Sequence, residues 1–452
     1  MTKSRLKKIL CGIAASSILA FGTVSTSEAA AIDQPMTYRT VTEVYDWGAS
    51  ISKLIINVGD NVKSSQINKD TFNVQVKRVL AEGAITYAEA MRRKDGRSDA
   101  VLGAETSDKD LEGDVQIENV YVSDADGNRI DSGEYITINL KVAPNYVLTA
   151  AMNWDPVSSY NQFVDSQFVI TAEKVGRIKN FVVTEKIGNI RPQADKFRFD
   201  TIGVSERMSF PYAAFEPKDN QKHPLIIWLH GMGEGGNAPS LPIMANKAVQ
   251  FADESIQNYF GGAYVFVPQA RTWWMEGYEK FADGTSVYSD WLMEGINAYV
   301  DAHPNIDKNR IYVGGDSNGG YMTMLLVRDN PGYFAAAFPT CEGLADELID
   351  EDDLRNIAKT PIWFIAAAAD TTLPPDKYSV QTVRRLKRLR ANVHFSYFEK
   401  VVDETGLYTK DDGSVYEYPG HWSWIYVYND RCVDTVDGKL VKLFEWMADQ
   451  HK

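Results

Sequence analysis

Residues 310–320 read RIYVGGDSNGG, and this segment carries the most information about the fold. The run 310–313 predicts a buried strand, and the apolar run 321–327 predicts a helix. Between them lies a Gly-x-Ser-x-Gly motif centred on Ser317, in the strand–turn–helix context that a nucleophile elbow requires. The serine of such an elbow occupies a strained turn, and the flanking glycines leave room for the neighbouring strand and helix. We therefore predict that Ser317 is a catalytic nucleophile.

The rest of the second half alternates between buried-strand patterns and helical patterns. This alternation predicts a mostly parallel sheet with helices on both faces. We assign residues 196–452 to one domain with the α/β-hydrolase fold. Its predicted strands lie at 225–229, 263–267, 310–313, 335–339, 361–368 and 393–398, and its predicted helices include 291–302 and 380–390.

A serine hydroxyl needs a base to take its proton and an acid to orient that base. Of the six histidines, His421 stands in a turn after the last strand region, and the triad of this fold follows the order serine, acid, histidine. The strand predicted at 361–368 leads to Asp370, where a carboxylate can orient the imidazole. We predict a triad of Ser317, Asp370 and His421, with Asp376 as the alternative acid.

Glycines are also frequent in the loop after the first predicted core strand. Residues 228–236 read WLHGMGEGG, and such a loop can direct a backbone N–H at the charge that develops on a substrate oxygen. We predict an oxyanion hole formed by Gly231, Met232 and Asn318. The alternative is a phosphate-binding loop, but the glycine spacing lacks the lysine followed by serine or threonine of a P-loop.

Aromatic residues lie close to these motifs in the sequence. The loop 268–274 follows the second predicted core strand, and Trp422 follows the predicted base directly. We expect Gln269, Trp273, Trp274 and Trp422 to line the substrate site. The alternative is that the tryptophans belong to the core, as most tryptophans do.

The predicted site is open and needs neither a metal nor a cofactor. About twenty residues separate Cys341 from the strand that starts at Pro361, which leaves no room for an inserted cap domain. An open site suits soluble esters with short acyl chains. No cluster of cysteine and histidine has the spacing of zinc ligands, and we expect no cofactor.

Residues 32–195 show a different pattern, that of an all-β domain. Short runs rich in β-branched and aromatic residues alternate with turn signals, which predicts an immunoglobulin-like β-sandwich. The turn at 124–128 contains Asp-Gly, which suits a hairpin. A calcium loop is the alternative there, but the glutamate that closes such a loop is missing. The predicted strands lie at 53–58, 71–79, 116–122, 135–142 and 168–171.

The first thirty residues have the pattern of a secretory signal peptide. Four basic residues precede an apolar stretch from Ile9 to Val24, and small residues at 29–31 offer a cleavage site. We predict that residues 1–30 are removed and that the protein is secreted, with an uncleaved anchor as the alternative. The formal net charge of −14 argues against nucleic acid and anionic membranes as partners. Cys341 and Cys432 then remain, and the sequence leaves open whether they form a disulfide.

On these motifs the chain resembles extracellular bacterial esterases in which an immunoglobulin-like domain precedes an α/β-hydrolase domain. The catalytic half of these esterases is related to polyhydroxybutyrate-depolymerase-like and prolyl-oligopeptidase-like serine hydrolases. The YDWG sequence at 45–48 resembles the start of the first domain, and 230–236 and 315–320 resemble the oxyanion loop and the elbow. Asp370 and His421 resemble the acid and the base. The resemblance implies hydrolysis of small carboxylic esters, mostly with short acyl chains, and a structural or homo-oligomerising role for the β domain.

Three other functions remain open on the sequence alone. A serine peptidase of prolyl-oligopeptidase type would usually screen its site with a repeated β-propeller, and residues 32–195 are too short and show no repeat. A feruloyl or acetyl esterase acting on plant polysaccharide would suit exposed aromatic residues. A binding module with an inactive hydrolase domain is disfavoured, because all three triad residues and the glycine-rich loop are present.

Overall fold

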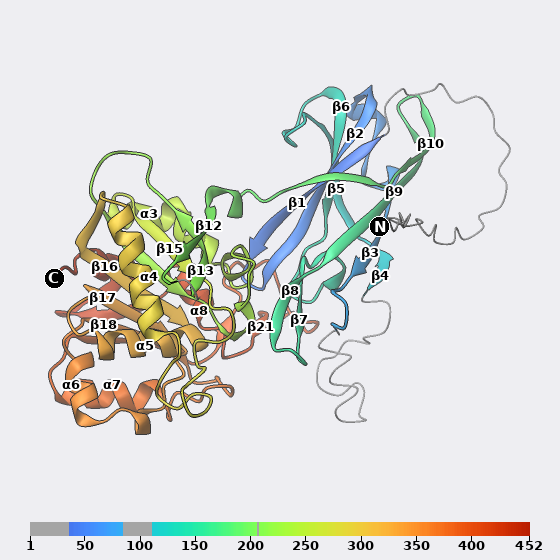
Figure 1. Ribbon diagram of the computed structural model, residues 1–452. Helices are drawn as coiled ribbons and strands as arrows, with labels where there is room; N and C mark the ends of the chain where they lie inside the picture. The colour runs from blue at the N-terminus through green and yellow to red at the C-terminus, as the bar shows by residue number, and fades with distance from the viewer. Residues whose placement is uncertain (1–35, 85–110, 206–207) are drawn as a thin grey trace, which may run out of the picture.

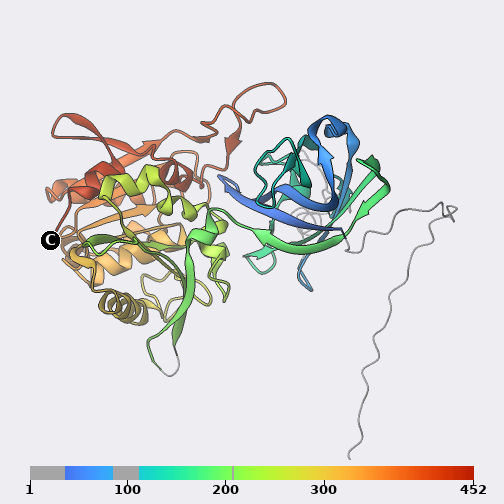
Figure 2. The same ribbon diagram turned by 90° about the horizontal axis from the view of Figure 1, so that it is seen from above.

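The computed structural model describes residues 36–84, 111–205 and 208–452, and the predicted signal peptide at 1–30 lies outside these ranges. Figure 1 shows two regions side by side, a β-rich region from the first half of the chain and a region of strands and helices from the second. The view from above in Figure 2 separates the same two regions. Among the described residues, none of the helices combines the length and apolar character needed to span a membrane.

The first region is a β-sandwich of two sheets. In the five-stranded sheet the order is β11-β1-β2-β6-β5, and in the four-stranded sheet it is β10-β9-β3-β4. A separate hairpin of β7 (Met152–Asp155) and β8 (Tyr160–Phe163) extends from it. This architecture confirms the predicted immunoglobulin-like domain. The strands of the two sheets are β1 (Thr37–Tyr45), β2 (Gly48–Lys63), β3 (Asn73–Val79), β4 (Glu112–Asp114), β5 (Ile117–Ser123), β6 (Ser132–Leu140), β9 (Asp165–Val175), β10 (Ile178–Val183) and β11 (Glu185–Ile190).

The alternating pattern of the strands places one face of each sheet in the core. In β3, Val74 and Val76 are buried while their sequence neighbours are exposed, as expected when successive side chains point to opposite faces. The two sheets are also joined by Tyr38 of β1, whose hydroxyl accepts a hydrogen bond of 2.9 Å from the N–H of Phe168 in β9. The same two rings pack edge to face. The sandwich is therefore held by apolar packing and by a polar link through its interior.

The predicted turn at 124–128 is confirmed. The Asp124 carboxylate accepts hydrogen bonds of 2.9 Å from the N–H groups of Asp126 and Asn128, and Gly127 has a φ of 87°. A left-handed residue at this place is readily supplied by glycine. The turn joins β5 to β6 as a plain hairpin connection.

The second region is built on an eight-stranded sheet in the order β12-β13-β15-β14-β16-β17-β18-β19. The six strands β15, β14, β16, β17, β18 and β19 run parallel to one another. At one edge, β13 pairs antiparallel with β15 and with the outermost strand β12. This confirms the mostly parallel sheet that strand–helix alternation predicted. The strands are β12 (Arg198–Gly203), β13 (Ser209–Phe215), β14 (His223–Leu229), β15 (Tyr264–Pro268), β16 (Ile306–Asp316), β17 (Ala336–Thr340), β18 (Ile362–Ala367) and β19 (Val393–Phe398).

Helices cover both faces of this sheet. In β14, Ile226 and Trp228 belong to one apolar cluster, and Leu225 and Ile227 belong to a second one on the opposite face. The first cluster includes residues of α3, α8 and α9, and the second includes residues of α4, α5, α6 and α7. The first cluster also continues into the β-sandwich, so the two regions share a continuous core. The α-helices are α2 (Leu241–Met244), α3 (Glu254–Phe260), α4 (Ser289–Ala302), α5 (Asn318–Asp329), α6 (Glu351–Ile357), α7 (Ser379–Arg388), α8 (Trp424–Tyr428) and α9 (Leu443–Ala448).

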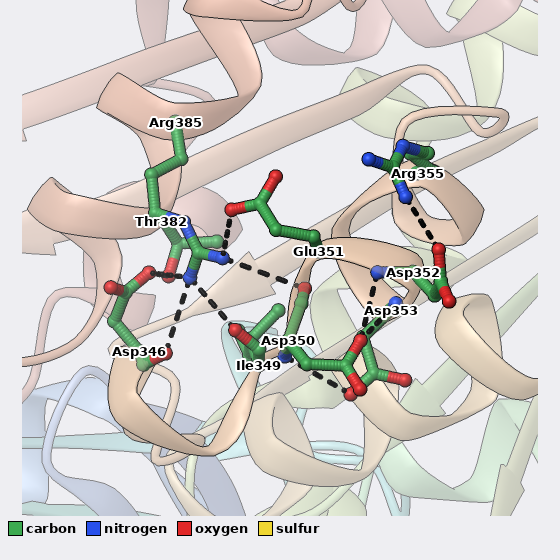
Figure 3. Close-up of polar contacts among 9 residues, drawn as sticks. All are labelled: Asp346, Ile349, Asp350, Glu351, Asp352, Asp353, Arg355, Thr382 and Arg385. Carbon is green, nitrogen blue, oxygen red and sulfur yellow. Dashed lines mark hydrogen bonds and ion pairs between the residues drawn. The ribbon is translucent and has the colours of Figure 1, made fainter.

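The connection from β17 to β18 is a compact helical segment tied to α7. Asp350 caps α6 by accepting hydrogen bonds of 2.8 Å from the N–H groups of Asp352 and Asp353. Arg385 of α7 donates to the Asp346 carboxylate and to the Ile349 carbonyl, as Figure 3 shows. These bonds hold the segment against the helical layer, consistent with the prediction that no cap domain is inserted here.

Candidate active site

The Ser317 turn lies between the central strand β16 and helix α5. Its φ of 55° and ψ of −112° are strained for a residue with a side chain. The Ser317 N–H donates a 2.9 Å hydrogen bond to the Thr340 carbonyl at the end of β17, which anchors the turn to the sheet. Gly319 lies so close to β14 that a Cβ atom there would overlap the Leu229 carbonyl. The strand–turn–helix predicted around Ser317 is therefore present.

Asp370 and His421 form a hydrogen-bonded pair. The distance from His421 Nδ1 to Asp370 Oδ2 is 2.7 Å, and the Asp370 side chain is 1% exposed. The other carboxylate oxygen, Oδ1, accepts hydrogen bonds of 2.8 and 2.9 Å from the N–H groups of Thr372 and Leu373. The turn thus fixes the carboxylate and leaves one oxygen for the imidazole. Asp376, the alternative acid, is exposed.

The loops that carry these three residues meet at the carboxyl edge of the parallel sheet. Cys341 follows β17, and its thiol lies against the Ser317 backbone and the side chain of Ser423, two residues from His421. Gly420 packs on the acid turn so closely that a Cβ there would lie 2.7 Å from the Asp370 nitrogen. Burial raises the pKa of the Cys341 thiol well above its ordinary value. In the part of the chain that the structure describes, Cys341 and Cys432 are both buried free thiols.

His230 fixes the loop that follows β14. It is completely buried, and burial lowers its pKa to about 4, so the ring is neutral at neutral pH. Its Nε2 accepts a 3.0 Å hydrogen bond from the N–H of Ala270, so Nδ1 carries the proton and donates to the Gly231 carbonyl at 2.7 Å. The C=O and N–H of a trans peptide point in opposite directions. Holding the Gly231 carbonyl therefore directs the Met232 N–H away from His230.

Asn318 contributes to the site through both its backbone and its side chain. It is the first residue of α5, and first-turn N–H groups have no partner within their own helix. Its side-chain Oδ1 accepts a 2.8 Å hydrogen bond from the N–H of Met275, which lies in the loop after β15. The side chain thus ties this loop to the elbow, and the backbone N–H is available for an anionic oxygen.

Two of the residues expected to contact substrate instead contact the glycine-rich loop 230–236. Gln269 is fully buried, and its Nε2 donates a 2.8 Å hydrogen bond to the Glu234 carbonyl. Trp274 is also fully buried and packs against His230 and Phe210. The prediction of substrate contact is wrong for Gln269 and Trp274, because the segment after β15 folds beneath the glycine-rich loop.

The other two residues expected to contact substrate, Trp273 and Trp422, are partly exposed. Trp273 stacks on Tyr160 of the β7–β8 hairpin, with ring centroids 5.5 Å apart. Trp422 stacks between Tyr418 and Trp424. Their contact with a substrate stays a prediction.

A pair of buried acids, Glu234 and Asp316, lies behind the glycine-rich loop and was not predicted from the sequence. Asn246 donates hydrogen bonds to Oε2 of Glu234 at 3.3 Å and to Oδ2 of Asp316 at 3.1 Å. Burial raises the pKa of Glu234 to about 7. Burial and the nearby Glu234 carboxyl raise the pKa of Asp316 well above its ordinary value. The sequence did hold a signal for them, because both acids lie inside glycine-rich motifs, close to the predicted nucleophile Ser317 and the predicted oxyanion donor Met232.

Two family matches cover separate parts of the chain. Residues 37–180 match the family described as the esterase Ig-like N-terminal domain, and residues 271–346 match the prolyl oligopeptidase family. The first match covers most of the β-sandwich, and the second contains Ser317 and its elbow. The chain is a serine hydrolase of esterase type.

One solved structure is similar to this chain over both domains, and others are similar to part of it. The crystal structure of a thermostable esterase aligns with a TM-score of 0.69 and 21% identity, over 93% of this chain and 100% of the other. An acylaminoacyl peptidase from Pyrococcus horikoshii aligns with a TM-score of 0.34 and 18% identity, over 54% of this chain and 43% of the other. A ferulic acid esterase aligns with a TM-score of 0.35 and 16% identity, over 45% of this chain and 90% of the other. No match was found among curated protein sequences.

Proposed function

We propose that this enzyme hydrolyses carboxylic esters with short acyl or aryl groups, with Ser317 as nucleophile, His421 as base and Asp370 as the orienting acid. The observation that carries the proposal is the 2.7 Å contact between His421 Nδ1 and Asp370 Oδ2, at the sheet edge that also holds the strained Ser317. An imidazole oriented by a buried carboxylate is what makes a nearby hydroxyl nucleophilic.

In the proposed reaction, Ser317 Oγ attacks the ester carbonyl while His421 Nε2 takes its proton. Asp370 stabilises the imidazolium that forms. The tetrahedral intermediate then collapses, the alcohol leaves with the proton from His421, and an acyl-enzyme remains on Ser317. A water molecule gives its proton to His421 and attacks the acyl carbon, which releases the acid and restores the serine.

The oxyanion of the intermediate is proposed to accept hydrogen bonds from the N–H groups of Met232 and Asn318. The Gly231 carbonyl, held by His230 at 2.7 Å, supports this role because it orients the Met232 peptide before substrate binds. Preorganised donors of this kind stabilise the developing charge without reorganisation during the reaction. Loss of one such donor typically costs about 3 kcal/mol of transition-state stabilisation.

The decisive experiment is turnover of p-nitrophenyl acetate and butyrate by the wild type, Ser317→Ala and His421→Ala. We expect both variants to lose at least about a thousandfold in kcat, as triad substitutions usually do. The exposed Ser414→Ala is the matched control and should keep wild-type turnover. Mass spectrometry of the wild type mixed with a slow aryl ester should detect one acyl group on Ser317. Full turnover by Ser317→Ala would contradict the proposal.

A peptidase activity is the second candidate, because residues 271–346 match the prolyl oligopeptidase family. A panel of p-nitrophenyl esters of increasing acyl length, feruloyl esters and a proline-containing chromogenic peptide separates these activities. We expect the short esters to have the highest kcat/KM. A higher kcat/KM for the peptide would favour the peptidase instead.

We also propose that the enzyme is exported and acts on a small soluble ester, without nucleic acid or membrane as a partner. The signal-peptide pattern of residues 1–30 and the net charge of −14 support this. A homo-oligomer formed through the β domain is a further proposal that rests on the family resemblance. N-terminal sequencing of protein recovered from the culture medium tests the export, and light scattering tests the assembly.

A further inference from the structure

The β7–β8 hairpin of the immunoglobulin-like domain lies directly on the glycine-rich loop of the catalytic domain. Asn161 Nδ2 donates a 2.5 Å hydrogen bond to Glu234 Oε1, across 73 residues of sequence. The ring of Tyr160 stacks on Trp273, with 12° between the ring planes. A Cβ atom at Gly233 would lie 2.6 Å from Asn161 Nδ2 and 2.8 Å from Trp154 Cζ3. The hairpin therefore touches the backbone of the loop, and only glycine leaves it room.

Glu234 is the anchor of this loop. Residues 232–234 form one turn of 3-10 helix that begins at Met232, the proposed oxyanion donor. The Glu234 N–H donates to the Gly231 carbonyl at 3.4 Å, and its own carbonyl accepts from Gln269 Nε2 at 2.8 Å. Its carboxyl group is held at both oxygens, by Asn161 and by Asn246. A shift of Glu234 would move the Met232 N–H with it, because they belong to the same helical turn.

The contact continues from Glu234 to the nucleophile turn. Asn246 also donates to Asp316 Oδ2, and Asp316 precedes Ser317 in the chain. Within the described part of the chain, Asp316 Oδ1 has no hydrogen-bond partner, which favours a protonated Asp316. Two buried carboxyl groups this close cannot both ionise at low cost. Of the two carboxyl groups, Glu234 accepts side-chain hydrogen bonds at both oxygens, and Asn161 supplies one of them.

A second contact fixes the approach of the two domains. Asp46, in the turn between β1 and β2, is buried and pairs with Lys247 Nζ at 2.7 Å. Asn429 donates to the same carboxylate at 3.1 Å. Lys247 directly follows Asn246, so both hairpins contact the segment that supports Glu234. The position of Asn161 is therefore set by two contacts between the domains, one through the β7–β8 hairpin and one through Asp46.

We propose that Asn161 is a positioning residue of the oxyanion hole, supplied to the catalytic site by the immunoglobulin-like domain and acting through Glu234. The inference rests on the proposed function, because it assigns Met232 as an oxyanion donor. The donor is used mainly in the transition state, so loss of the Asn161 contact should lower kcat and leave KM nearly unchanged. Errors of about 1 Å in catalytic geometry can cost about a hundredfold in rate, so we expect a loss of tenfold or more.

The test is an isosteric substitution and its reciprocal rescue. Asn161→Asp keeps the shape of the side chain but replaces the N–H donor with an oxygen that faces Glu234 Oε1. At about pH 8, where an ordinary carboxyl group is ionised, this variant should lose about tenfold or more in kcat with little change in KM. The double variant N161D/E234Q exchanges donor and acceptor and should recover most of the lost kcat. Asn189→Ala removes hydrogen bonds to Thr40 and Thr42 inside the same domain and should leave kcat unchanged.

Each outcome separates this inference from the proposed function. If Ser317→Ala is inactive and Asn161→Asp keeps the wild-type kcat, the positioning role is wrong and the proposed function stands. If N161D/E234Q is folded by circular dichroism but recovers no more kcat than N161D, Asn161 does not act through Glu234 and the inference fails. Turnover by Ser317→Ala would overturn the proposed function first. Should Asn161→Asp fail to fold, the kcat of the folded double variant relative to wild type decides, and a tenfold deficit contradicts the proposal.

Discussion

The two sides of the active site are held in different ways. On the acid side, Asp370 is oriented by N–H groups two and three residues further along its own turn. On the oxyanion side, the loop 230–236 is held by residues far away in the chain. These include Ala270, 40 residues from His230, and Asn161, 73 residues from Glu234. The Asp370 carboxylate is therefore oriented by its own turn before it meets His421, 51 residues away, whereas the loop 230–236 depends on how distant elements and a second domain pack around it.

Removal of the acid should have the largest effect on activity. Asp370→Asn keeps the shape of the side chain but presents an amide to the imidazole and favours the wrong tautomer. Such a change lowers kcat by about ten-thousandfold in comparable triads. The exposed Asp376→Asn is the control and should stay within about twofold of wild type. Initial rates with p-nitrophenyl butyrate measure both, and the reverse ranking would transfer the acid role to Asp376.

Removal of the inter-domain cation should have the next largest effect, on stability. Lys247→Met leaves the Asp46 carboxylate, 5% exposed, without its ammonium partner. Breaking a buried ion pair by removing one partner costs about 3 kcal/mol or more. Urea unfolding should show this loss. The double variant D46N/K247M should recover a large part of it, because no unpaired charge remains. Equal stabilities of wild type and Lys247→Met would mean that this contact does not hold the domains together.

Removal of the His230 hydrogen bonds should lower activity by a smaller factor than loss of the acid. His230→Phe keeps an aromatic ring against Trp274 but frees the Gly231 carbonyl and the Ala270 N–H. We expect kcat to fall by about tenfold to a hundredfold with a nearly constant KM, since loss of an oxyanion donor costs about a hundredfold. Steady-state kinetics with a short acyl ester measures it. A rise in KM at constant kcat would show that His230 serves substrate binding instead.

The smallest effect concerns the pH dependence of stability. The pKa of His230 is lowered from 6.5 to about 4 by burial, so between these values the folded protein binds fewer protons than the unfolded chain. Its contribution to stability is therefore complete above about pH 6.5 and is lost as the pH falls towards 4. Melting temperatures of wild type and His230→Phe should differ more at neutral pH than near pH 4. A constant difference would mean that folding does not lower the pKa of His230.

The features that could be predicted from the sequence are those with a local signal. The hydrophobic run of β16, the glycines of the elbow and the position of Asp370 after β18 are all read from short segments. Their contacts are formed mainly by neighbours in the sequence or by adjacent parallel strands. The expected order of serine, acid and histidine then pointed to the pair that the structure brings to 2.7 Å.

The features that could not be predicted are those in which packing decides a residue's environment. Gln269 and Trp274 were expected to face a substrate because their loop follows a core strand, as active-site loops do. Whether such a loop lies over the site or beneath a neighbouring loop depends on the contacts it finds. Here Gly236 donates a 2.8 Å hydrogen bond to the Ala270 carbonyl and draws the two loops together. The sequence pattern of this segment does not indicate that Gln269 and Trp274 are buried.

The sequence alone determined that this protein has a β-sandwich followed by a mostly parallel sheet. It also determined that a serine on a tight turn is followed along the chain by an acid and then a histidine. These features follow from hydrophobic periodicity and turn chemistry, which act over a few residues. Only the tertiary structure shows that Asn161 of one domain contacts Glu234 of the other, and that Glu234 shares Asn246 with Asp316. Contacts between residues so far apart arise from the docking of two folded surfaces, and no short stretch of sequence encodes that docking.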